Sequence, residues 1–136
     1  MQYLLDTDIC IYTIKKRPAS VIHRLTELAT SDVALSIISL FELQFGVETS
    51  QHSEQARLAL DHFIAPIQYI LPLDRLAINY AAKIRADLKR KGTPIGAYDL
   101  LIAAIALAND MILVSNNTRE FQRVDGLKLE NWVNNG

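Results

Sequence analysis

The sequence is poor in cysteine, in long hydrophobic runs and in net charge. Its single cysteine among 136 residues excludes an internal disulfide bond and leaves too few thiolates for a zinc cluster. The longest unbroken apolar run, residues 100–108, is about half the length that a membrane-spanning helix requires. No basic segment precedes the first apolar residues, so we expect no secretory signal, no membrane contact and a cytoplasmic location.

A large excess of charge of either sign is also missing. The 14 Lys and Arg residues against 15 Asp and Glu residues give a formal net charge of −1 at pH 7. A nucleic-acid partner would therefore have to be held by local basic patches or through a bound cation. Apolar residues make up 50% of the chain, which excludes a disordered protein and suffices for one hydrophobic core. We therefore expect one domain over residues 1–136, without repeats or linkers.

Short apolar runs alternate with segments of helical spacing. We expect strands at residues 3–5, 33–36, 69–71, 111–114 and 127–129. We expect helices at residues 9–14, 18–29, 40–47 (ending near Gly46), 54–64, 74–91 (capped by Asp74 and ended by Gly92) and 100–108. This alternation predicts an α/β fold of three layers, with a mostly parallel central sheet flanked by helices.

Acidic and polar residues occur where predicted strands end. Asp6 and Asp8 follow the first strand, and residues 115–117 (Ser-Asn-Asn) follow the fourth. Loops at the carboxyl ends of parallel strands form the ligand crevice of such sheets, so these side chains should share one crevice. Glu42 and Asp99 lie in sequence that we expect to be mostly buried, where a carboxylate needs a partner.

Convergence of Asp6, Glu42 and Asp99 would crowd negative charge, since no basic residue lies near them in the sequence. Two carboxylates about 5 Å apart repel by about 3 kcal/mol at an effective dielectric constant of about 20. A whole domain is stable by only about 5–15 kcal/mol, so a proton or a cation has to relieve the repulsion. Oxygen ligands favour Mg²⁺ or Mn²⁺, and such an ion suits phosphodiester hydrolysis.

Each of these residues also has a purely local interpretation. The alternatives are a helix cap for Asp6 or Asp8, a capping box for Ser39 and Glu42, a first-turn acid for Asp99 and a turn residue for Asn117. These local roles explain the residues one at a time, whereas a shared crevice explains them together.

Four motifs follow one another along nearly the whole chain. They are Tyr3-Leu-Leu-Asp-Thr-Asp8, Ser36-Ile-Ile-Ser-x-x-Glu-Leu43 followed by Gly46, Gly92-x-x-Ile-Gly-x-x-Asp-x-x-Ile-Ala103, and Leu113-Val-Ser-Asn-Asn-Thr-Arg-Glu-Phe121. In this order and spacing they resemble the PIN-domain family, specifically the VapC-type toxins of bacterial toxin–antitoxin modules.

The resemblance implies a PIN-like fold and a ribonuclease that depends on Mg²⁺ or Mn²⁺. Family members are usually homodimers, cut selected RNAs such as transfer or ribosomal RNA, arrest translation in this way, and are inhibited by a cognate antitoxin that inserts a segment into the active site. The family's acidic positions fall on Asp6, Glu42 and Asp99, which would hold the metal. The fourth family position, often Asp, is Asn117 in this sequence. Asn117 would orient a water or a phosphate oxygen. Because Asn is neutral, it weakens the case for a second tightly held metal ion.

Further residues are candidates for supporting roles. We expect Thr7, Asp8, Ser115 and Glu120 to surround the metal ligands. Asp8 stands where we expect Asn in close relatives, and it either restores the charge lost at Asn117 or caps the next helix. RNA contacts are candidates at Lys15, Lys16, Arg17, residues 89–91, Arg119 and Arg123, although such clusters also describe an ordinary solvated surface.

Hydrophobic residues outside these motifs have structural interpretations. Phe41 and Phe45 lie one helical turn apart, which is typical of core positions, although part of this face is also a candidate dimer or antitoxin surface. Cys10 should fill the core, and Trp132 should dock the end of the chain.

Two other functions stay open. Residues 4–8 also resemble the start of haloacid-dehalogenase-type phosphatases, but the lysine and the late acidic pair of that family are missing after Val114. A module that binds metal or RNA without turnover is the other alternative, because Asn117 replaces an acid. His23, His52 and His62 have no metal-ligand spacing, so a histidine acid–base ribonuclease has no support.

Overall fold

A parallel sheet forms the centre of the protein. The structure is a computed structural model that describes residues 2–133. The strands are β1 (Tyr3–Leu5), β2 (Val33–Ser36), β3 (Tyr69–Leu71), β4 (Ile112–Val114) and β5 (Leu129–Glu130). They pair in the order β3-β2-β1-β4-β5, and every pairing is parallel. The expected α/β fold with a parallel sheet between helices is confirmed.

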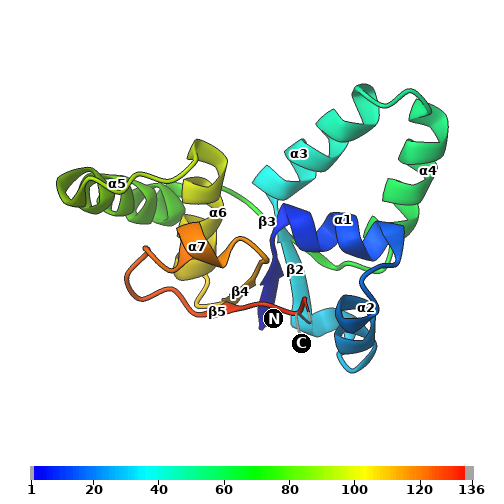
Figure 1. Cartoon of the computed structure of the whole chain (residues 1–136), viewed down its shortest axis with the longest axis horizontal. Coiled ribbons are helices and arrows are strands. Elements are labelled where there is room, and N and C mark those ends of the chain that lie inside the picture. The colour runs from blue at the N-terminus through cyan, green and yellow to red at the C-terminus, as the bar shows by residue number, and fades with distance from the viewer. Residues whose placement is uncertain (1, 134–136) are drawn as a thin grey trace.

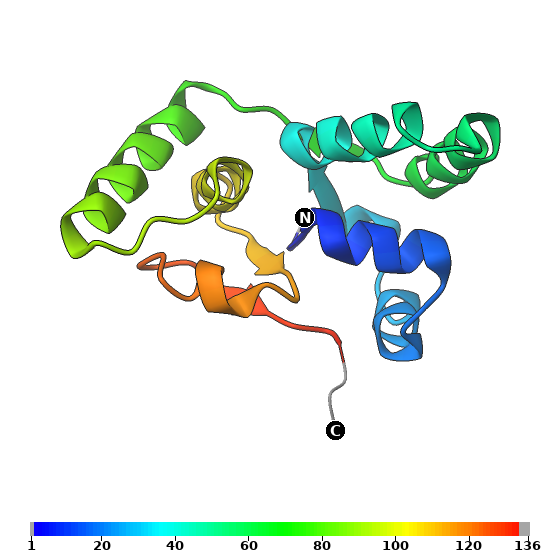
Figure 2. The ribbon, with the colours of Figure 1, turned by 45° about the horizontal axis from the view of Figure 1, so that its top comes forward.

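Helices cover the sheet on both sides (Figure 1). On one side lie α1 (Thr7–Lys15), α2 (Ala19–Thr26), α3 (Ile37–Glu48) and α4 (Ser53–Ile64). On the other side lie α5 (Arg75–Lys91), α6 (Ala97–Ala108) and the short α7 (Thr118–Phe121). Figure 2 shows α3 and α4 lying side by side as a hairpin, with α6 between α5 and the sheet. None of the helices within residues 2–133 is long and apolar enough to cross a bilayer.

Two hydrophobic cores follow from the alternation of side chains along the strands. Leu4 of β1 and Leu113 of β4 point into the core that contains the buried helix α6. Leu5 and Val114, the next residues along, point into the core beneath α1, α2 and α4. Cys10 is fully buried in this second core, as predicted. The central strands β1 and β2 therefore bury both of their faces, which explains their largely apolar sequence.

The ends of two helices differ from the sequence prediction. Helix α3 begins three residues before residue 40, because the Ser36 hydroxyl accepts the Ser39 backbone N–H at 3.0 Å and caps the helix. It continues past Gly46, whose α-carbon faces open space, so glycine there does not end the helix. Helix α6 begins at Ala97 rather than residue 100, since its first turn is exposed and carries no hydrophobic signal.

The position of the last strand also differs from the sequence prediction. It covers Leu129–Glu130 rather than residues 127–129, because Gly126 has a φ of 80° and the Leu127 N–H bonds back to the Val124 carbonyl. Residues 124–127 are thus a turn. The other elements lie within about one turn of their predicted positions, and the cap at Asp74 and the end at Gly92 are confirmed.

The sheet topology determines where a ligand can bind. Strand β1 is central, with β2 on one side and β4 on the other. The chain runs outward from β1 through β2 to β3 and then crosses to β4 and β5 on the other side of β1, and ligands bind at the carboxyl ends of the strands at such a switch point. The loops that follow β1 and β4 and the first turns of α3 and α6 border the position of the predicted crevice, at the carboxyl ends of the strands (Figure 1).

Candidate active site

The site begins where β1 ends. Asp6 is the N-cap of α1, and its Oδ1 accepts the Thr7 backbone N–H at 2.8 Å. Its Oδ2 accepts the Ser115 hydroxyl at 2.7 Å from the end of the neighbouring strand β4. The side chain is only 5% exposed. The local alternative of a helix cap is therefore true of Asp6, but the cap bond uses one oxygen and the other joins the second strand.

The loop after β4 connects the elements of the crevice. The Ser115 hydroxyl, bonded to Asp6, also accepts the Asn117 backbone N–H at 2.9 Å. The Asn117 side-chain amide donates to Asp99 Oδ2 at 3.0 Å and to Glu120 Oε2 at 2.9 Å. A continuous set of hydrogen bonds thus runs from β1 through β4 to α6 and α7.

Glu42 enters the crevice from α3. Its Oε1 accepts the Thr7 hydroxyl at 2.7 Å, and the Ser39 hydroxyl lies 3.0 Å from the same Thr7 oxygen. The proposed capping box of Ser39 and Glu42 is wrong, because Ser36 is the N-cap and the Glu42 carboxylate faces α1 instead of the start of its own helix. Thr7 therefore links Glu42 to the residue that follows Asp6.

Burial and mutual repulsion keep two carboxyls protonated far above their usual range. Burial first, and then the charge of Asp8, raise the pKa of Asp6 to about 7. Burial, a hydrogen bond with Glu120 and the charge of Asp6 raise the pKa of Asp99 to about 8. The charge of Glu42 contributes to both increases, so Asp6, Glu42 and Asp99 share one electrostatic environment.

Two further acids, Asp8 and Glu120, form carboxyl pairs with Asp6 and Asp99. Burial raises the pKa of Asp8, whose side chain is hydrogen-bonded to that of Asp6. The hydrogen bond from Asp99 is the largest cause that lowers the pKa of Glu120. Each pair can therefore hold one proton between two carboxyl groups, which is how like charges coexist at short range.

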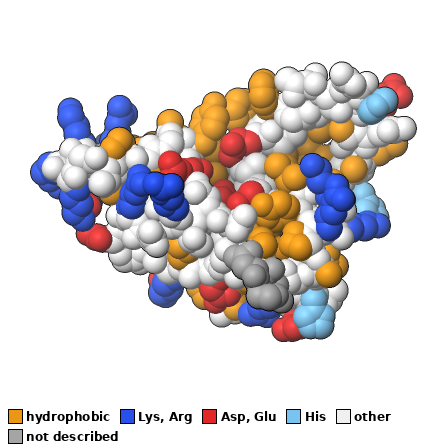
Figure 3. Space-filling model, in the orientation of Figure 1, with side chains coloured by type: hydrophobic (Ala, Val, Ile, Leu, Met, Phe, Trp, Pro, Cys, Tyr) orange, Lys and Arg blue, Asp and Glu red, His pale blue; other side chains and the backbone are white. Residues whose placement is uncertain are grey.

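These acids have no ion-pair partners among the Lys and Arg side chains of the described residues. Among residues 2–133, no Lys or Arg forms an ion pair with Asp6, Asp8, Glu42, Asp99 or Glu120. Figure 3 shows acidic side chains at the centre of this face, with the Lys and Arg side chains toward its sides. The side chains of the described residues form no ready group of three or more His, Cys, Asp or Glu ligands for a metal ion. The donor chemistry nonetheless fits a hard cation, because all donors are oxygens and a bound cation would relieve the mutual repulsion of these acids.

Basic residues lie at different distances from the crevice. Arg119 is exposed on α7, next to Glu120. Arg123 donates to the Pro94 carbonyl at 3.1 Å, and its charge helps to lower the pKa of Glu120. The remaining candidates are at helix ends remote from Asp6: Lys15, Lys16 and Arg17 at the end of α1, and residues 89–91 at the end of α5. Their contact with RNA stays a prediction.

The expected core role of two aromatic residues is wrong. Phe41 and Phe45 are 52% and 60% exposed. Leu43 and Val47 occupy the buried face of α3 instead, because a helix flanked by neighbours on one side buries only one stripe. The Phe41 ring meets the ring of Tyr98 edge-on, with 5.8 Å between centroids.

Sequence reasoning did not predict the contacts of three residues near the site. It gave Ser39 only the capping-box role, whereas the Ser39 hydroxyl lies beside that of Thr7. It placed Asn116 in the crevice with its neighbours, but it did not mark Tyr12, whose hydroxyl accepts the Asn116 side-chain amide across 104 residues of sequence.

The chain matches the PIN domain family over residues 3–127. A parallel sheet with clustered acids at the carboxyl ends of β1 and β4 is therefore the frame of a PIN domain, and the chain belongs to this family. This assignment removes the haloacid-dehalogenase alternative.

Similarity to individual proteins shows which group within the PIN domain family the chain belongs to. The chain is 42% identical over 132 residues to the tRNA(fMet)-specific endonuclease VapC of Shigella flexneri, covering 97% of this chain and 98% of that protein. It is 43% identical over 133 residues to ribonuclease VapC2 of Rickettsia felis, with the same coverage. The solved structure of DNA-bound VapBC from Salmonella typhimurium matches with a TM-score of 0.91 and 39% identity, over 98% of this chain and 99% of that one. The chain is therefore a member of the VapC ribonuclease toxins.

Proposed function

We propose that residues 1–136 form a single nuclease domain that hydrolyses selected RNA with the help of Mg²⁺ or Mn²⁺, in the cytoplasm where such RNA is found. The observation that carries the proposal is the shared electrostatic environment of Asp6, Glu42 and Asp99, which come from a strand end and two helices. Acids that repel each other in this way and lack Lys or Arg partners among residues 2–133 favour a divalent cation as their relief.

The metal ligands are Asp6, Glu42 and Asp99. A Mg²⁺ or Mn²⁺ ion held by these residues would supply neutralisation of the phosphate charge and activation of the attacking water. The protein residues around it hold the ligands in place: Ser115 orients Asp6, and Thr7 orients Glu42. The Asn117 amide group donates to Asp99 and Glu120 and so orients Asp99, which leaves its side-chain oxygen as the neutral group to orient a water beside the phosphate. The products are a 5′-phosphate and a 3′-hydroxyl.

Transfer RNA is the proposed substrate class. The relative from Shigella flexneri is named a tRNA(fMet)-specific endonuclease, and it aligns with nearly the full length of this chain. Arg119 is the proposed phosphate contact, because it is exposed and adjoins Glu120 at the rim of the crevice.

Cleavage of total RNA tests the function. Purified protein should cut a small set of RNAs with Mg²⁺ or Mn²⁺ and stop when a chelator removes the ion, and sequencing of the new ends should reveal 5′-phosphates. A Zn²⁺-loaded or heat-inactivated sample is the control. Cleavage that persists in chelator would reject the metal role, and an absence of cleavage with either ion would favour the binding module without turnover.

An antitoxin is the proposed inhibitor. The relative from Salmonella typhimurium was solved as a VapBC complex. In this chain a mostly apolar groove of about 230 Å³ runs between α1, α3 and α4, lined by residues such as Ile11, Ile14 and Leu43, with Glu42 at its side. A bound antitoxin segment would lie against these residues and reach the acids. Ile14→Asp should weaken inhibition by the antitoxin without altering metal-dependent cleavage.

A second copy of the chain is the other proposed partner. Phe41 and Phe45 project from α3, while an apolar groove of about 940 Å³ lies between α5 and α6. Phe41 and Phe45 form an apolar ridge. The ring of Phe41 contacts Tyr98, which is next to groove residue Ala97, so the ridge and the groove are continuous. In a two-fold dimer, the ridge of each copy can fill the groove of the other. Phe45→Asp should yield monomers in light scattering, whereas Leu58→Asp, at an exposed position on α4, should leave the dimer intact.

A further inference from the structure

One residue of the loop after β4 is held from three directions although it is exposed. The Asn116 backbone N–H donates to Asp8 Oδ2 at 3.0 Å, and its side-chain amide donates to the Tyr12 hydroxyl at 3.2 Å. Its side-chain oxygen accepts the Asn131 amide at 3.0 Å. Exposed side chains rarely need so many bonds for stability, since water supplies equivalent partners. The arrangement instead determines the position of the loop.

The two neighbours of Asn116 are the residues that touch the acids. Ser115 donates to Asp6, and Asn117 donates to Asp99. Consecutive residues are joined by planar peptide units, so a fixed Asn116 restricts where both neighbours can point. Small misplacements of such groups are costly in catalysis.

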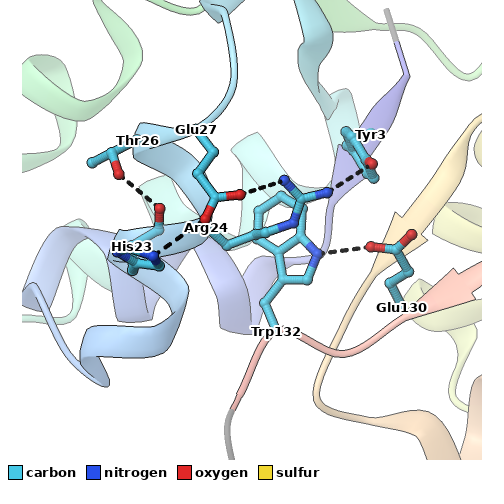
Figure 4. A network of polar contacts seen from close by, with 7 residues as sticks. All are labelled: Tyr3, His23, Arg24, Thr26, Glu27, Glu130 and Trp132. Atoms are coloured by element: carbon cyan, nitrogen blue, oxygen red, sulfur yellow. Dashed lines mark hydrogen bonds and ion pairs between the residues drawn. The ribbon is translucent and has the colours of Figure 1, made fainter.

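Asn131 belongs to a segment that is itself anchored. Its side-chain oxygen accepts the Val133 backbone N–H at 2.9 Å, which closes a turn. Trp132, 7% exposed, meets the Tyr3 ring edge-on with 5.4 Å between centroids. The Arg24 guanidinium lies over both rings, at 5.5 Å from that of Tyr3 and 5.4 Å from that of Trp132 (Figure 4).

Further hydrogen bonds reinforce this anchor. The Trp132 indole N–H donates to Glu130 at 3.0 Å, and Arg24 donates to the Tyr3 hydroxyl at 3.0 Å (Figure 4). The Ser115 backbone N–H bonds to the Glu130 carbonyl at 3.0 Å. The segment of residues 129–133, which we term the strap, thus connects helix α2 and strand β1 with the loop after β4.

We infer that the strap positions the active-site loop, and that Asn131, Asn116 and Tyr12 are positioning residues for the RNA cleavage reaction. This inference rests on the proposed function for its catalytic part. Asn131 touches neither acid, and it acts through Asn116 on the directions of Ser115 and Asn117.

The test compares Asn131→Ala with Asn131→Asp. The aspartate retains an oxygen for the Val133 N–H but has no amide to donate to Asn116, so it removes the cross-link and keeps the turn. Both variants should reduce kcat about 10- to 100-fold, the size typical of lost support around metal ligands, with KM for RNA changed less than about 2-fold. Lys128→Ala is the matched control, because Lys128 directly precedes the strap and its ion pair with Asp110 does not touch the loop.

A second measurement is independent of activity. Amide hydrogen exchange of Asn116 and Asn117, followed by NMR on metal-free protein, should accelerate in both Asn131 variants while the exchange of Leu4 and Leu113 stays slow. Unchanged exchange in the loop would overturn the strap's role as a support, whether or not the parent protein cleaves RNA. Faster exchange with an unchanged kcat would overturn the positioning role.

A double variant shows whether Asn131 acts through Asn116. If it does, Asn116→Ala combined with Asn131→Ala should lose no more activity than Asn116→Ala alone. Multiplied losses would mean that Asn131 acts by another route, which contradicts the inference. A parent protein that cleaves no RNA would reject the proposed function, and the exchange data would still decide whether the strap holds the loop.

Discussion

Two polar clusters lie at opposite ends of β1 and differ in whether their charged side chains have partners of opposite charge. Around Tyr3, Arg24 is ion-paired with Glu27 at 3.4 Å and stacked on aromatic rings (Figure 4). Around Asp6, the acids meet hydroxyls, amides and one another. The first cluster matches each charge with a partner, whereas the second one crowds like charges.

The difference indicates what each cluster does. Matched charges and stacked rings contribute to stability and hold Trp132 against β1 and α2. Crowded acids with raised pKa values reduce the stability of the ionised protein, and such arrangements cluster at functional sites. The following predictions separate the two clusters, since variants of the acids should affect cleavage and variants of the aromatic cluster should affect folding.

Removal of one charge in the crevice should have the largest effect. Asp6→Asn and Asp99→Asn each take away a proposed metal ligand, so RNA cleavage should fall by at least about 100-fold. Circular dichroism and thermal unfolding should confirm that both variants fold. Asp61→Asn on α4 is the matched control, and near-normal cleavage by both crevice variants would reject the site assignment.

Removal of the tryptophan should instead affect stability. Trp132→Ala deletes a buried ring that packs on Tyr3 and Arg24, which should lower the free energy of unfolding by about 3 kcal/mol in urea titrations. Trp132→Phe should lose less, since part of the ring contact persists. A loss below about 1 kcal/mol for the alanine variant would mean that the cluster contributes little to folding.

The pH dependence of stability should differ between the parent and Asp99→Asn. The pKa of Asp99 is raised from 3.8 to about 8, so between these pH values the folded protein binds more protons than the unfolded chain. The stabilising contribution is complete below the unfolded pKa and is lost as pH rises toward 8. In chelator, the melting temperature of the parent should therefore fall more steeply over this range than that of Asp99→Asn. Parallel curves for the two proteins would contradict the raised pKa.

The smallest effect concerns RNA affinity. Arg119→Ala should weaken RNA binding a few-fold and reduce the slope of log affinity against log salt by about 0.7, the value for one phosphate contact on a single strand. Arg75→Ala, at an exposed position at the start of α5 outside the candidate RNA contacts, is the control. Equal slopes for parent and Arg119→Ala would remove Arg119 from the interface.

Prediction from sequence succeeded where the signal is local. Strands such as residues 3–5 are recognisable because both faces are buried, and the acids are recognisable because they interrupt or end apolar sequence. It was less accurate at the start of α6, where the first turn is exposed, and at Phe41, where only the packing of α3 determines which face is buried. The strap had no local signal, because its bonds join residues far apart in the chain.

The sequence by itself determined the alternation of strands and helices and the residue types at each strand end, since backbone propensity and hydrophobic periodicity act over a few residues. Only the tertiary structure decided which acids pair, which hydroxyl bonds to each of them, and how Asn131 reaches the loop beside Asp6 and Asp99. Those choices depend on strand order and helix packing, because hydrogen bonds and electrostatic repulsion act over a few ångströms between residues that the fold alone makes neighbours.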